Sequence, residues 1–249
     1  MIVRRAWRRL ADRIRRLGSG GRDAALLSEE AFWNGWLAKQ DRPGFAFRTD
    51  ALAPLQPWLW CHLDSSRPVH RVLDVGCGPL SVVGRVVPAG RLDLTCCDPL
   101  AKRYLALLRR HGIEPIHAID DVAGEELSRR YGTGHFDMAF SNNAVDHAAN
   151  PLEVLRQMAL VVRRDGTVLV QVGEDEGRHG GYRGLHQWDF SEHHGRLRLA
   201  SKAADALDVT EALSPWLIQR SIERVDINPA GLRWEHTHLR IVWTRRGNS

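Results

Sequence analysis

A short glycine-rich turn at residues 74–78 is the stretch best suited to bind a small ligand. It has the sequence Asp-Val-Gly-Cys-Gly and follows the apolar residues Val72 and Leu73. Gly76 and Gly78 have no Cβ, so the backbone there can approach a bound molecule closely. Apolar residues resume at 80–87, which predicts that a buried parallel strand passes through the turn into a helix whose free amides face the ligand.

An acid follows this turn at an interval that suits a nucleoside ligand. Asp98 lies 20 residues beyond Gly78, directly after the predicted strand 91–97. Dinucleotide-binding folds place at about this interval an acid that binds ribose, and a carboxylate can accept hydrogen bonds from both ribose hydroxyls. Ser81 stands where their third glycine would be, which argues against a nicotinamide cofactor. The alternative is a solvated acid at the end of a strand.

Predicted strands and helices alternate along most of the chain. Strands are expected at 71–75, 91–97, 114–119, from 136, and at 164–172, 196–201, 222–227 and 238–244. Helices are expected after the glycine turn and at 28–37, capped by Ser28, 104–108, 152–160 and 208–213. Such alternation specifies a parallel sheet covered by helices on both faces, with ligands at the carboxyl ends of the strands.

The positive charge is concentrated at the N-terminus. Residues 1–17 hold seven arginines and one aspartate, while the whole chain has a net charge of +5. Apolar residues recur among these arginines at helical spacing, which predicts a basic amphipathic helix. This helix either lies on an anionic membrane surface or packs its apolar stripe on the domain. The glycine-rich residues 18–21 are expected to form a flexible joint.

The remaining composition fits one α/β domain. The chain has 249 residues, of which 43% are hydrophobic. No apolar run approaches the ~20 residues that a membrane span needs, and no secretory signal is evident. We therefore expect a cytoplasmic protein, associated with a membrane at most at its surface. The four cysteines match neither a disulfide framework nor a zinc spacing, so they are expected to be reduced core residues.

Two motifs resemble those of the class I S-adenosylmethionine-dependent methyltransferases. Residues 72–79, V-L-D-V-G-C-G-P, resemble motif I, and residues 136–151 resemble the fourth strand and motif, with F-D at the start, N-A-V-D-H and a final proline. The resemblance covers residues 69 to about 172. It implies S-adenosyl-L-methionine as cofactor. It also implies a Rossmann-like, doubly wound sheet of seven strands, mostly parallel with an antiparallel last strand. N-terminal helices and a lid or hairpin insertion after the fifth strand are expected in addition.

The resemblance also implies a set of cofactor contacts and a domain plan. The expected cofactor-binding residues are Asp74, Gly76, Cys77, Gly78, Asp98, Pro99, Asp121, Glu125 and Asn142. For the acid that meets the adenine amino group, the segment G-E-x-L favours Glu125, with Asp121 as second choice. The expected units are a basic helix at 1–17, a helical cap at 22–68 and the cofactor domain at 69–249, with its insertion at about 174–214.

Methyl transfer from a sulfonium is a direct displacement, so the enzyme must align the nucleophile and remove the proton of a hydroxyl acceptor. His147, which follows the fourth strand, is the first candidate for the base, although a histidine there could instead hold its loop. The glycine-rich segment 177–190 is a candidate lid that brings His186 and Asp189, or else a mobile surface loop. Histidines and acids together could bind a metal, but no typical ligand spacing appears, so we expect none.

The sequence favours an O-methyltransferase that acts on a sugar, a glycan or a small-molecule hydroxyl. The D-H-x-x-x-P and G-L-H-Q-W-D-F segments resemble bacterial methyltransferases of polysaccharide or natural-product tailoring. A nucleic-acid methyltransferase is one alternative. It is disfavoured because residues 141–144 lack the N/D-P-P-aromatic element that grips a flipped base, and because the charge lies in one terminal helix. A catalytically silent methyltransferase-fold binding protein is the other alternative.

Overall fold

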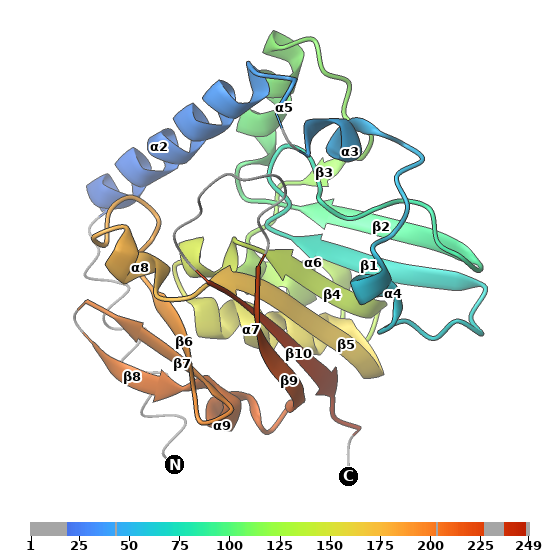
Figure 1. Ribbon diagram of the computed structural model, residues 1–249, viewed down its shortest axis with the longest axis vertical. Helices are drawn as coiled ribbons and strands as arrows, with labels where there is room; N and C mark the ends of the chain where they lie inside the picture. Colours follow the sequence, from blue (N-terminus) through green and yellow to red (C-terminus); the bar gives the residue numbers. More distant parts are fainter. Residues whose placement is uncertain (1–18, 43, 203, 227–236, 248–249) are drawn as a thin grey trace.

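A large twisted sheet forms the centre of the computed structural model, which describes residues 19–42, 44–202, 204–226 and 237–247 (Figure 1). Its strands occur in the order β3-β2-β1-β4-β5-β10-β9. The strands of this sheet are β1 (Val69–Val75), β2 (Arg91–Cys97), β3 (Ile119–Asp120), β4 (Phe136–Asn142), β5 (Val162–Gly173), β9 (Leu217–Val225) and β10 (His238–Arg245). The basic helix expected at 1–17 lies outside the described residues.

The strand directions confirm the predicted Rossmann-like sheet. Strands β1 to β5 are mutually parallel, whereas β10 lies antiparallel between β5 and β9. The carboxyl ends of β1, β2 and β4 therefore meet at one edge, which the registers Val75↔Cys97 and Asp74↔Phe140 align. Any ligand bound by the turns after these strands must lie at this edge.

Helices cover both faces of the sheet. The helices are α2 (Ser19–Leu37), α3 (Phe45–Thr49), α4 (Pro57–Trp60), α5 (Ala101–Arg110), α6 (Leu127–Tyr131), α7 (Pro151–Val161), α8 (Glu176–His179) and α9 (Val209–Leu213), with 3₁₀ turns η1 (Gly124–Glu126) and η2 (Val145–His147). No helix among the described residues is long and apolar enough to cross a membrane.

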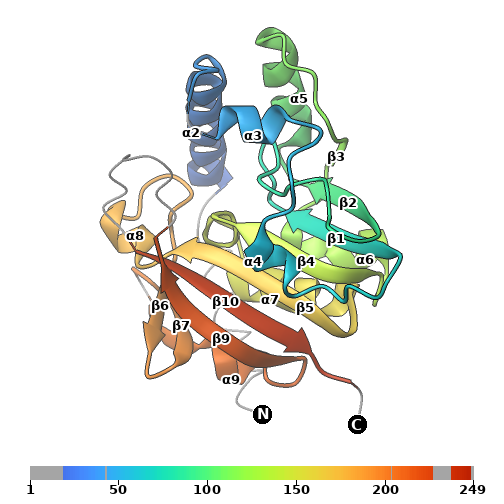
Figure 2. The ribbon, with the colours of Figure 1, turned by 45° about the vertical axis from the view of Figure 1, so that its right-hand side comes forward.

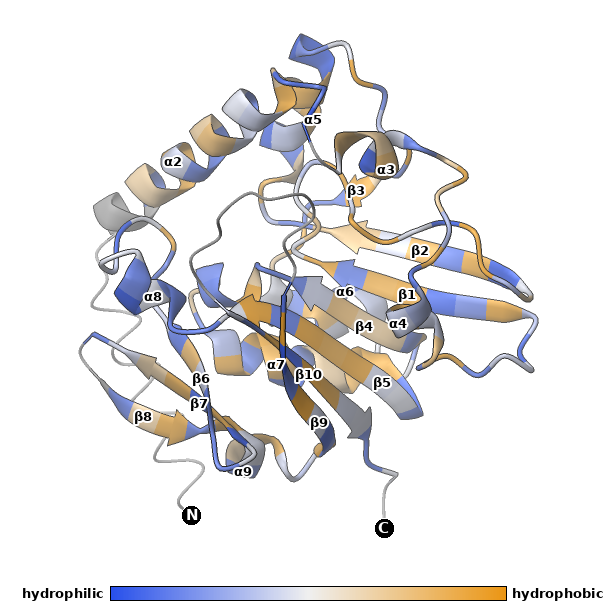
Figure 3. Cartoon of the chain, in the orientation of Figure 1, coloured by the Kyte–Doolittle hydropathy of each residue, from blue (hydrophilic) through white to orange (hydrophobic). Residues whose placement is uncertain are grey.

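Alternating side chains of the central strands divide the core into two layers. On β1, Val72 packs with the residues around α4, whereas Leu73 packs with those of α7. On β4, Ala139 and Phe140 divide in the same way. Because both faces are covered, apolar residues fill the inner part of these strands, as the orange stretch of β5 in Figure 3 shows. Their apolar runs explain why the sequence predicted them well.

The helix expected after the glycine turn is absent, which corrects the sequence analysis. Residues 76–90, all described, form turns and bends between β1 and β2. The backbone of this segment is held by residues 53–55 instead: Val86 N and Arg85 N both donate to Ala53 O, and Leu55 N donates to Val86 O. A Cβ on Gly84 would lie 2.0 Å from Pro54 O, so only glycine allows this contact. The amides of Arg85 and Val86 therefore bind residue 53 and are not available for the hydrogen bonds of a helix.

Two further boundaries differ from the prediction. Helix α2 starts at Ser19 and runs through most of the expected flexible joint, so Ser28 lies inside a helix and not at its N-cap. The third strand is confined to Ile119–Asp120, because only Cys96 and Cys97 of β2 pair with it. Neither change moves the edge of the sheet where the site is expected.

The insertion after β5 forms a small sheet of its own. It consists of β6 (Asp189–His193), β7 (Arg196–Ser201) and β8 (Ala204–Asp208), all antiparallel, followed by α9. Helix α8 precedes this sheet. In Figures 1 and 2, α2 and α8 both lie at the end of the large sheet toward which the arrowheads of β1, β4 and β5 point. The two helices thereby flank the predicted site.

The close contact between Gly76 and the segment after β4 predicts a large effect of one methyl group. Gly76 has φ +70°, and a Cβ there would lie 2.4 Å from Ala144 Cβ. We expect Gly76→Ala to lower the free energy of unfolding by about 3 kcal/mol or more, from left-handed strain and overpacking together. Gly112 has φ +65° with nothing within 4 Å. Gly112→Ala should therefore cost only the strain, about 1–2 kcal/mol. Equal effects in urea unfolding would contradict the packing argument.

Candidate active site

The glycine turn presents its backbone at the end of β1. Gly76 N donates to Cys97 O over 2.8 Å, which ties the turn to β2. Gly78 has φ +64°, and a Cβ there would lie 3.0 Å from the Trp33 ring. Cys77 between them is buried. The turn is thus fixed in a conformation that only glycine tolerates well, with an aromatic ring of α2 directly over it.

Asp74, the acid of the turn, is buried beneath it. The Ser81 hydroxyl donates to Asp74 Oδ2 over 2.6 Å, and Ser81 Oγ accepts from Val83 N over 3.0 Å. Burial raises the pKa of Asp74 to about 6, although the Ser81 hydroxyl and the Arg48 charge oppose that shift. Ser81, the residue in place of the third glycine, therefore anchors the carboxylate under the turn.

Asp98 joins the end of β2 to the glycine turn. Its Oδ2 accepts from Gly78 N over 3.1 Å, and its Oδ1 accepts from Leu100 N over 2.8 Å. Burial raises the pKa of Asp98 to about 6, against the lowering effect of these two amides. Pro99 follows it with an exposed side chain. The predicted proximity of this acid to the turn is therefore present, although a loop and not a helix connects β1 to β2.

The two candidate adenine acids lie in different surroundings. Asp121 pairs with Lys102 Nζ over 2.7 Å and lines an open hollow of about 480 Å³. The lining of this hollow consists of Asp120, Asp121, Val122, Glu126, Arg129 and Arg130. Glu125, the favoured candidate, instead accepts a hydrogen bond from Asn150 N over 3.0 Å, just before α7. One of its oxygens is therefore already used.

The end of β4 carries an amide pair. Asn142 Oδ1 accepts from Gln171 Nε2 over 2.9 Å, which holds this side chain against β5. Asn143 adopts φ +47°, and its Nδ2 lies 3.2 Å from His238 Nε2. The left-handed residue turns the chain back toward η2, which begins two residues later.

Asp146, His147 and His186 form a cluster at this edge of the sheet. Asp146 Oδ2 lies 3.2 Å from His186 Nδ1 and 3.4 Å from His147 Nε2. The two imidazoles meet edge to face, with ring centroids 4.6 Å apart. Folding thus brings together a residue pair after β4 and a histidine from the loop after α8. The structure brings the two predicted candidates His147 and His186 together, with Asp146 between them.

The charges of this cluster stabilise one another. Burial alone would raise the pKa of the Asp146 carboxyl, but the two histidines outweigh that effect and hold it below its ordinary value. The hydrogen bond to Asp146 raises the pKa of His186, against the lowering effect of burial, and Glu176 adds to the rise. Glu176 Oε1 lies 3.8 Å from His186 Nδ1. The cluster therefore favours positive charge on the His186 imidazole.

Asp189, the third predicted catalytic residue, does not join this cluster through any hydrogen bond or ion pair described for it. Its Oδ1 accepts from Arg178 N over 2.7 Å, and its Oδ2 accepts from the Tyr182 hydroxyl over 2.5 Å. Trp188 Nε1 donates to Ala148 O over 3.0 Å next to it. Both carboxylate oxygens thus serve the loop that carries His186.

Helix α2 and the segment after it bring residues that the sequence analysis did not include in the site. Trp33 Nε1 donates to Glu29 Oε1 over 2.8 Å, and Glu29 Oε2 lies 4.0 Å from His147 Nδ1. Arg48 Nη1 donates to Leu80 O over 2.6 Å, and its guanidinium lies 5.6 Å from the Trp33 ring centroid. Burial lowers the pKa of Arg48 to about 10, so it stays charged at neutral pH.

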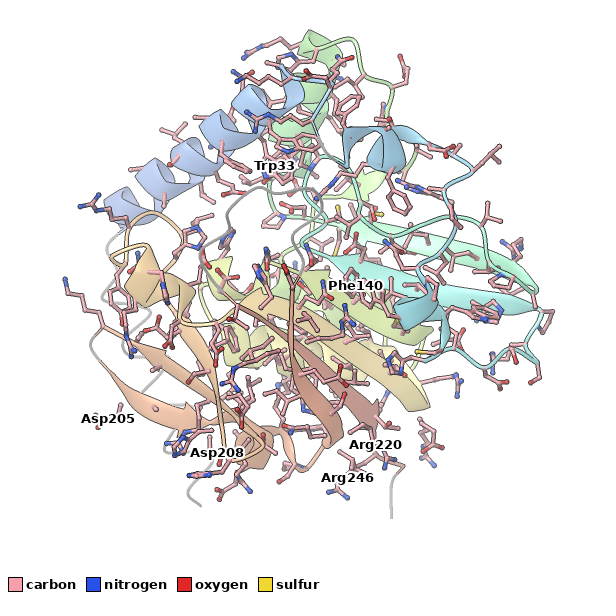
Figure 4. The ribbon with its side chains drawn as sticks, in the orientation of Figure 1. Trp33, Phe140, Asp205, Asp208, Arg220 and Arg246 are labelled. Atoms are coloured by element: carbon pink, nitrogen blue, oxygen red, sulfur yellow. The ribbon has the colours of Figure 1, made fainter. Side chains whose placement is uncertain are left out.

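The position of these residues follows from tertiary packing. Helix α2 packs on α5, where Leu37 and Tyr104 share a buried cluster. Figure 4 shows Trp33 on α2, facing the core of the molecule. The one available sequence signal was an arginine inside the aromatic stretch 45–60, since a cation among aromatic residues is commonly stacked or functional.

Comparisons with known proteins agree with this geometry. Residues 73–170 match a family model described as a methyltransferase domain. No curated protein matches the chain. A chain in the complex of the Haloferax volcanii Trm112 methyltransferase activator with a methyltransferase is 14% identical, with a TM-score of 0.52, and the match covers 87% of this chain and 97% of that one.

Two other solved structures show lower structural similarity. The Burkholderia thailandensis 1,6-didemethyltoxoflavin-N1-methyltransferase, with its substrate and S-adenosylhomocysteine bound, is 20% identical over 90% of this chain and 89% of that one, with a TM-score of 0.48. A SAM-dependent methyltransferase from Aquifex aeolicus is 12% identical over 85% and 97%, with a TM-score of 0.46.

The domain match, the strand order and the turn after β1 together show a methyltransferase domain that includes residues 73–170. Its cofactor is S-adenosyl-L-methionine. The residues at the edge of the sheet fit this group, because the buried Asp98 carboxylate stands next to the glycine turn and is a suitable acceptor for ribose hydroxyls.

The bonds of Asp189 predict what its loss would do. Asp189→Ala removes both acceptors that hold residues 178–182, so the loop should open more often and trypsin should cleave after Arg178 and Arg183 at least about fivefold faster. Tyr182→Phe removes one of the two bonds and should give an intermediate rate. Asp93→Ala, an exposed acid on β2, is the control. Unchanged cleavage in Asp189→Ala would refute the anchoring role.

Proposed function

We propose that this methyltransferase transfers the methyl group of S-adenosylmethionine to a hydroxyl of a small-molecule or glycan acceptor. The observation that carries this proposal is the position of the cluster Asp146, His147 and His186. Ala144, two residues before Asp146, lies directly against Gly76 of the glycine turn. An acceptor beside the histidines would therefore be close to the methyl group of a cofactor bound over the turn.

The cofactor side is assigned by chemistry. Asp98 accepts hydrogen bonds from the ribose hydroxyls, and the backbone of Gly76, Cys77 and Gly78 approaches the methionine portion. Glu125 remains the first candidate for the adenine amino group and Asp121 the second, since each already uses one carboxylate oxygen, Glu125 on Asn150 N and Asp121 on Lys102 Nζ. The remaining predicted contacts, which are Asp74 beneath the turn, Pro99 and Asn142, are also assigned to the cofactor side.

Arg48 is added to the cofactor side. Its guanidinium lies within 5.6 Å of the centroid of the Trp33 ring, which covers Gly78. No ion pair is described for it among the residues of the structure. The charge of Asp74 acts on Arg48 without a direct ion pair. A carboxylate such as that of the methionine portion would supply a direct partner, which a guanidinium can bind through two hydrogen bonds.

The acceptor side is assigned to the histidines. As the oxygen–carbon bond forms and the sulfur–carbon bond breaks, the hydroxyl proton must be removed. The cluster Asp146, His147 and His186 carries out that step, with Asp146 orienting both rings. Asp189 is proposed as a positioning residue, since its carboxylate holds the loop that brings His186. Selection of a sugar acceptor and a membrane contact through residues 1–17 rest on the sequence alone.

A turnover assay tests the proposed function. The full chain is incubated with methyl-labelled S-adenosylmethionine and a panel of phenols, sugars and lipid-linked sugars, with amines for comparison. Because proton removal contributes typically about 100- to 10,000-fold, His147→Ala and His186→Ala should each lower turnover at least about 100-fold. Binding of S-adenosylhomocysteine should change little in both variants.

His193→Ala is the matched control, because His193 is exposed on β6 and should leave turnover unchanged. Transfer to amines but to no hydroxyl would overturn the acceptor class. Full activity of both histidine variants would remove them from the reaction.

The raised pKa of Asp98 predicts pH-dependent cofactor binding. Above its pKa of about 6 the carboxylate is ionised and accepts from both hydroxyls, whereas protonation at lower pH removes a charged acceptor. The affinity for S-adenosylhomocysteine, measured by calorimetry, should therefore fall as the pH drops from 7.5 to 5.

Substitution at the same position should remove this dependence. Asp98→Asn should weaken binding at pH 7.5 by about 10- to 100-fold, the value of a charged hydrogen bond, and should bind with little change between pH 7.5 and 5. Asp93→Asn, on the exposed part of the same strand, should behave as the wild type. A pH dependence retained in Asp98→Asn would assign it to another group.

A further inference from the structure

The cluster of Asp146, His147 and His186 contains nitrogen and oxygen atoms that could bind a metal ion. One ligand atom from each of the three residues lies within 4.8 Å of the others. Both imidazoles face the same oxygen, Asp146 Oδ2. The other oxygen, Asp146 Oδ1, is buried without a hydrogen-bond partner, on a side chain that is 3% exposed. A buried carboxylate oxygen without a partner can accept a bond from an ion or a water.

The spacing of these atoms corresponds to the edges of a metal coordination shell. An ion bound at about 2.1 Å separates neighbouring ligands by about 3.0 Å at right angles and by about 3.4 Å in a tetrahedron. The two observed separations from Asp146 Oδ2, 3.2 Å to His186 Nδ1 and 3.4 Å to His147 Nε2, fall in this range. The second is long for a direct N–H···O hydrogen bond.

The surroundings supply what such a site needs beyond its three ligands. Glu29 Oε2 lies 4.0 Å from His147 Nδ1, the ring nitrogen that does not face Asp146, and Trp33 Nε1 holds the other oxygen of Glu29. A carboxylate behind the imidazole commonly orients metal-binding histidines. Glu176 Oε1, 3.8 Å from His186 Nδ1, is close enough to become a further ligand after a small movement. The acids also lower the electrostatic cost of binding a cation.

We propose that Asp146, His147 and His186 bind a divalent transition-metal ion at the acceptor side of the cofactor. Two imidazole nitrogens and a carboxylate select ions such as Zn²⁺, Mn²⁺, Fe²⁺ or Co²⁺ over Mg²⁺ and Ca²⁺, which prefer oxygen ligands throughout. Three protein ligands leave coordination positions open, which is typical of a catalytic site. The sequence analysis expected no metal because no typical ligand spacing appears along the chain, whereas these three residues come from two distant segments.

A metal ion at this site would also assist the transfer to a hydroxyl, and this part of the inference rests on the proposed function. The ion would bind the acceptor oxygen and lower its pKa, so that the hydroxyl proton leaves to solvent. The oxygen then forms a bond to the methyl carbon, the sulfur–carbon bond breaks, and the electron pair stays on sulfur. The products are the methyl ether and S-adenosylhomocysteine, and no oxidant or reductant is needed.

Titration of the metal-stripped full chain with Co²⁺ tests the proposal without any acceptor. Visible absorption and calorimetry should report one equivalent bound with a dissociation constant of micromolar or below. His147→Ala, His186→Ala and Asp146→Asn should each weaken binding at least 10-fold. Unchanged binding of S-adenosylhomocysteine by these variants would confirm that they are folded.

A second histidine pair provides the matched control. His193 and His194 are exposed, and their ring centroids are 4.2 Å apart. The double variant His193→Ala/His194→Ala should bind Co²⁺ as the wild type does. Binding that this control abolishes, or that the three site variants leave intact, would overturn the proposal, as would the absence of binding.

The two proposals fail in different ways. Methyl transfer that needs both histidines but proceeds unchanged in the metal-stripped chain would retain the proposed function and reject the metal site. Tight Co²⁺ binding that depends on the three ligands, with no transfer to any hydroxyl, would retain the metal site and reject the proposed function.

Discussion

The structure depends on a contact that has no room for a single additional carbon atom. Gly76 lies so close to Ala144 that the turns after β1 and β4 are locked together. Everything proposed for the site follows from this packing: the glycine turn approaches the cofactor on one side, and the residues that follow Ala144 lead within three positions into Asp146 and His147 on the other. Because protein interiors are dense and resist compression, this contact fixes the position of one turn relative to the other.

The parts of the fold that the sequence predicted well are those in which local pattern and tertiary packing agree. Strands β1, β4 and β5 are covered on both faces, so their apolar runs could be recognised without knowledge of their neighbours. The position of Asp98 was predicted because chain order in a parallel sheet fixes which strand ends are adjacent. The failures arose where distant segments decided the outcome. Residues 53–55 bind the backbone of residues 84–86, and no local pattern at 76–90 reveals that competition.

The site was predictable to the same extent. His147 and His186 were both recognised as candidates from their segments, yet Asp146, which lies between them, was not among the candidate residues. Asp189 is in the predicted loop, but Tyr182 and the Arg178 amide use both of its oxygens.

Glu29 and Arg48 were missed because their roles depend on how α2 and the segment after it pack over the strand ends. A carboxylate in a helix or an arginine in a loop has no distinctive spacing of its own.

The loop that replaces the expected helix between β1 and β2 has a consequence for ligand selection. A helix that starts at a glycine turn directs its partial positive charge toward bound phosphates, and that field is what a pyrophosphate requires. Residues 76–90 provide no such field. S-adenosylmethionine carries no phosphate, and its sulfonium is itself positive, so it loses nothing from the change and avoids an unfavourable dipole. The edge of this sheet thus lacks the helix field that a phosphate-bearing nucleotide would use, and a cofactor without phosphate does not need that field.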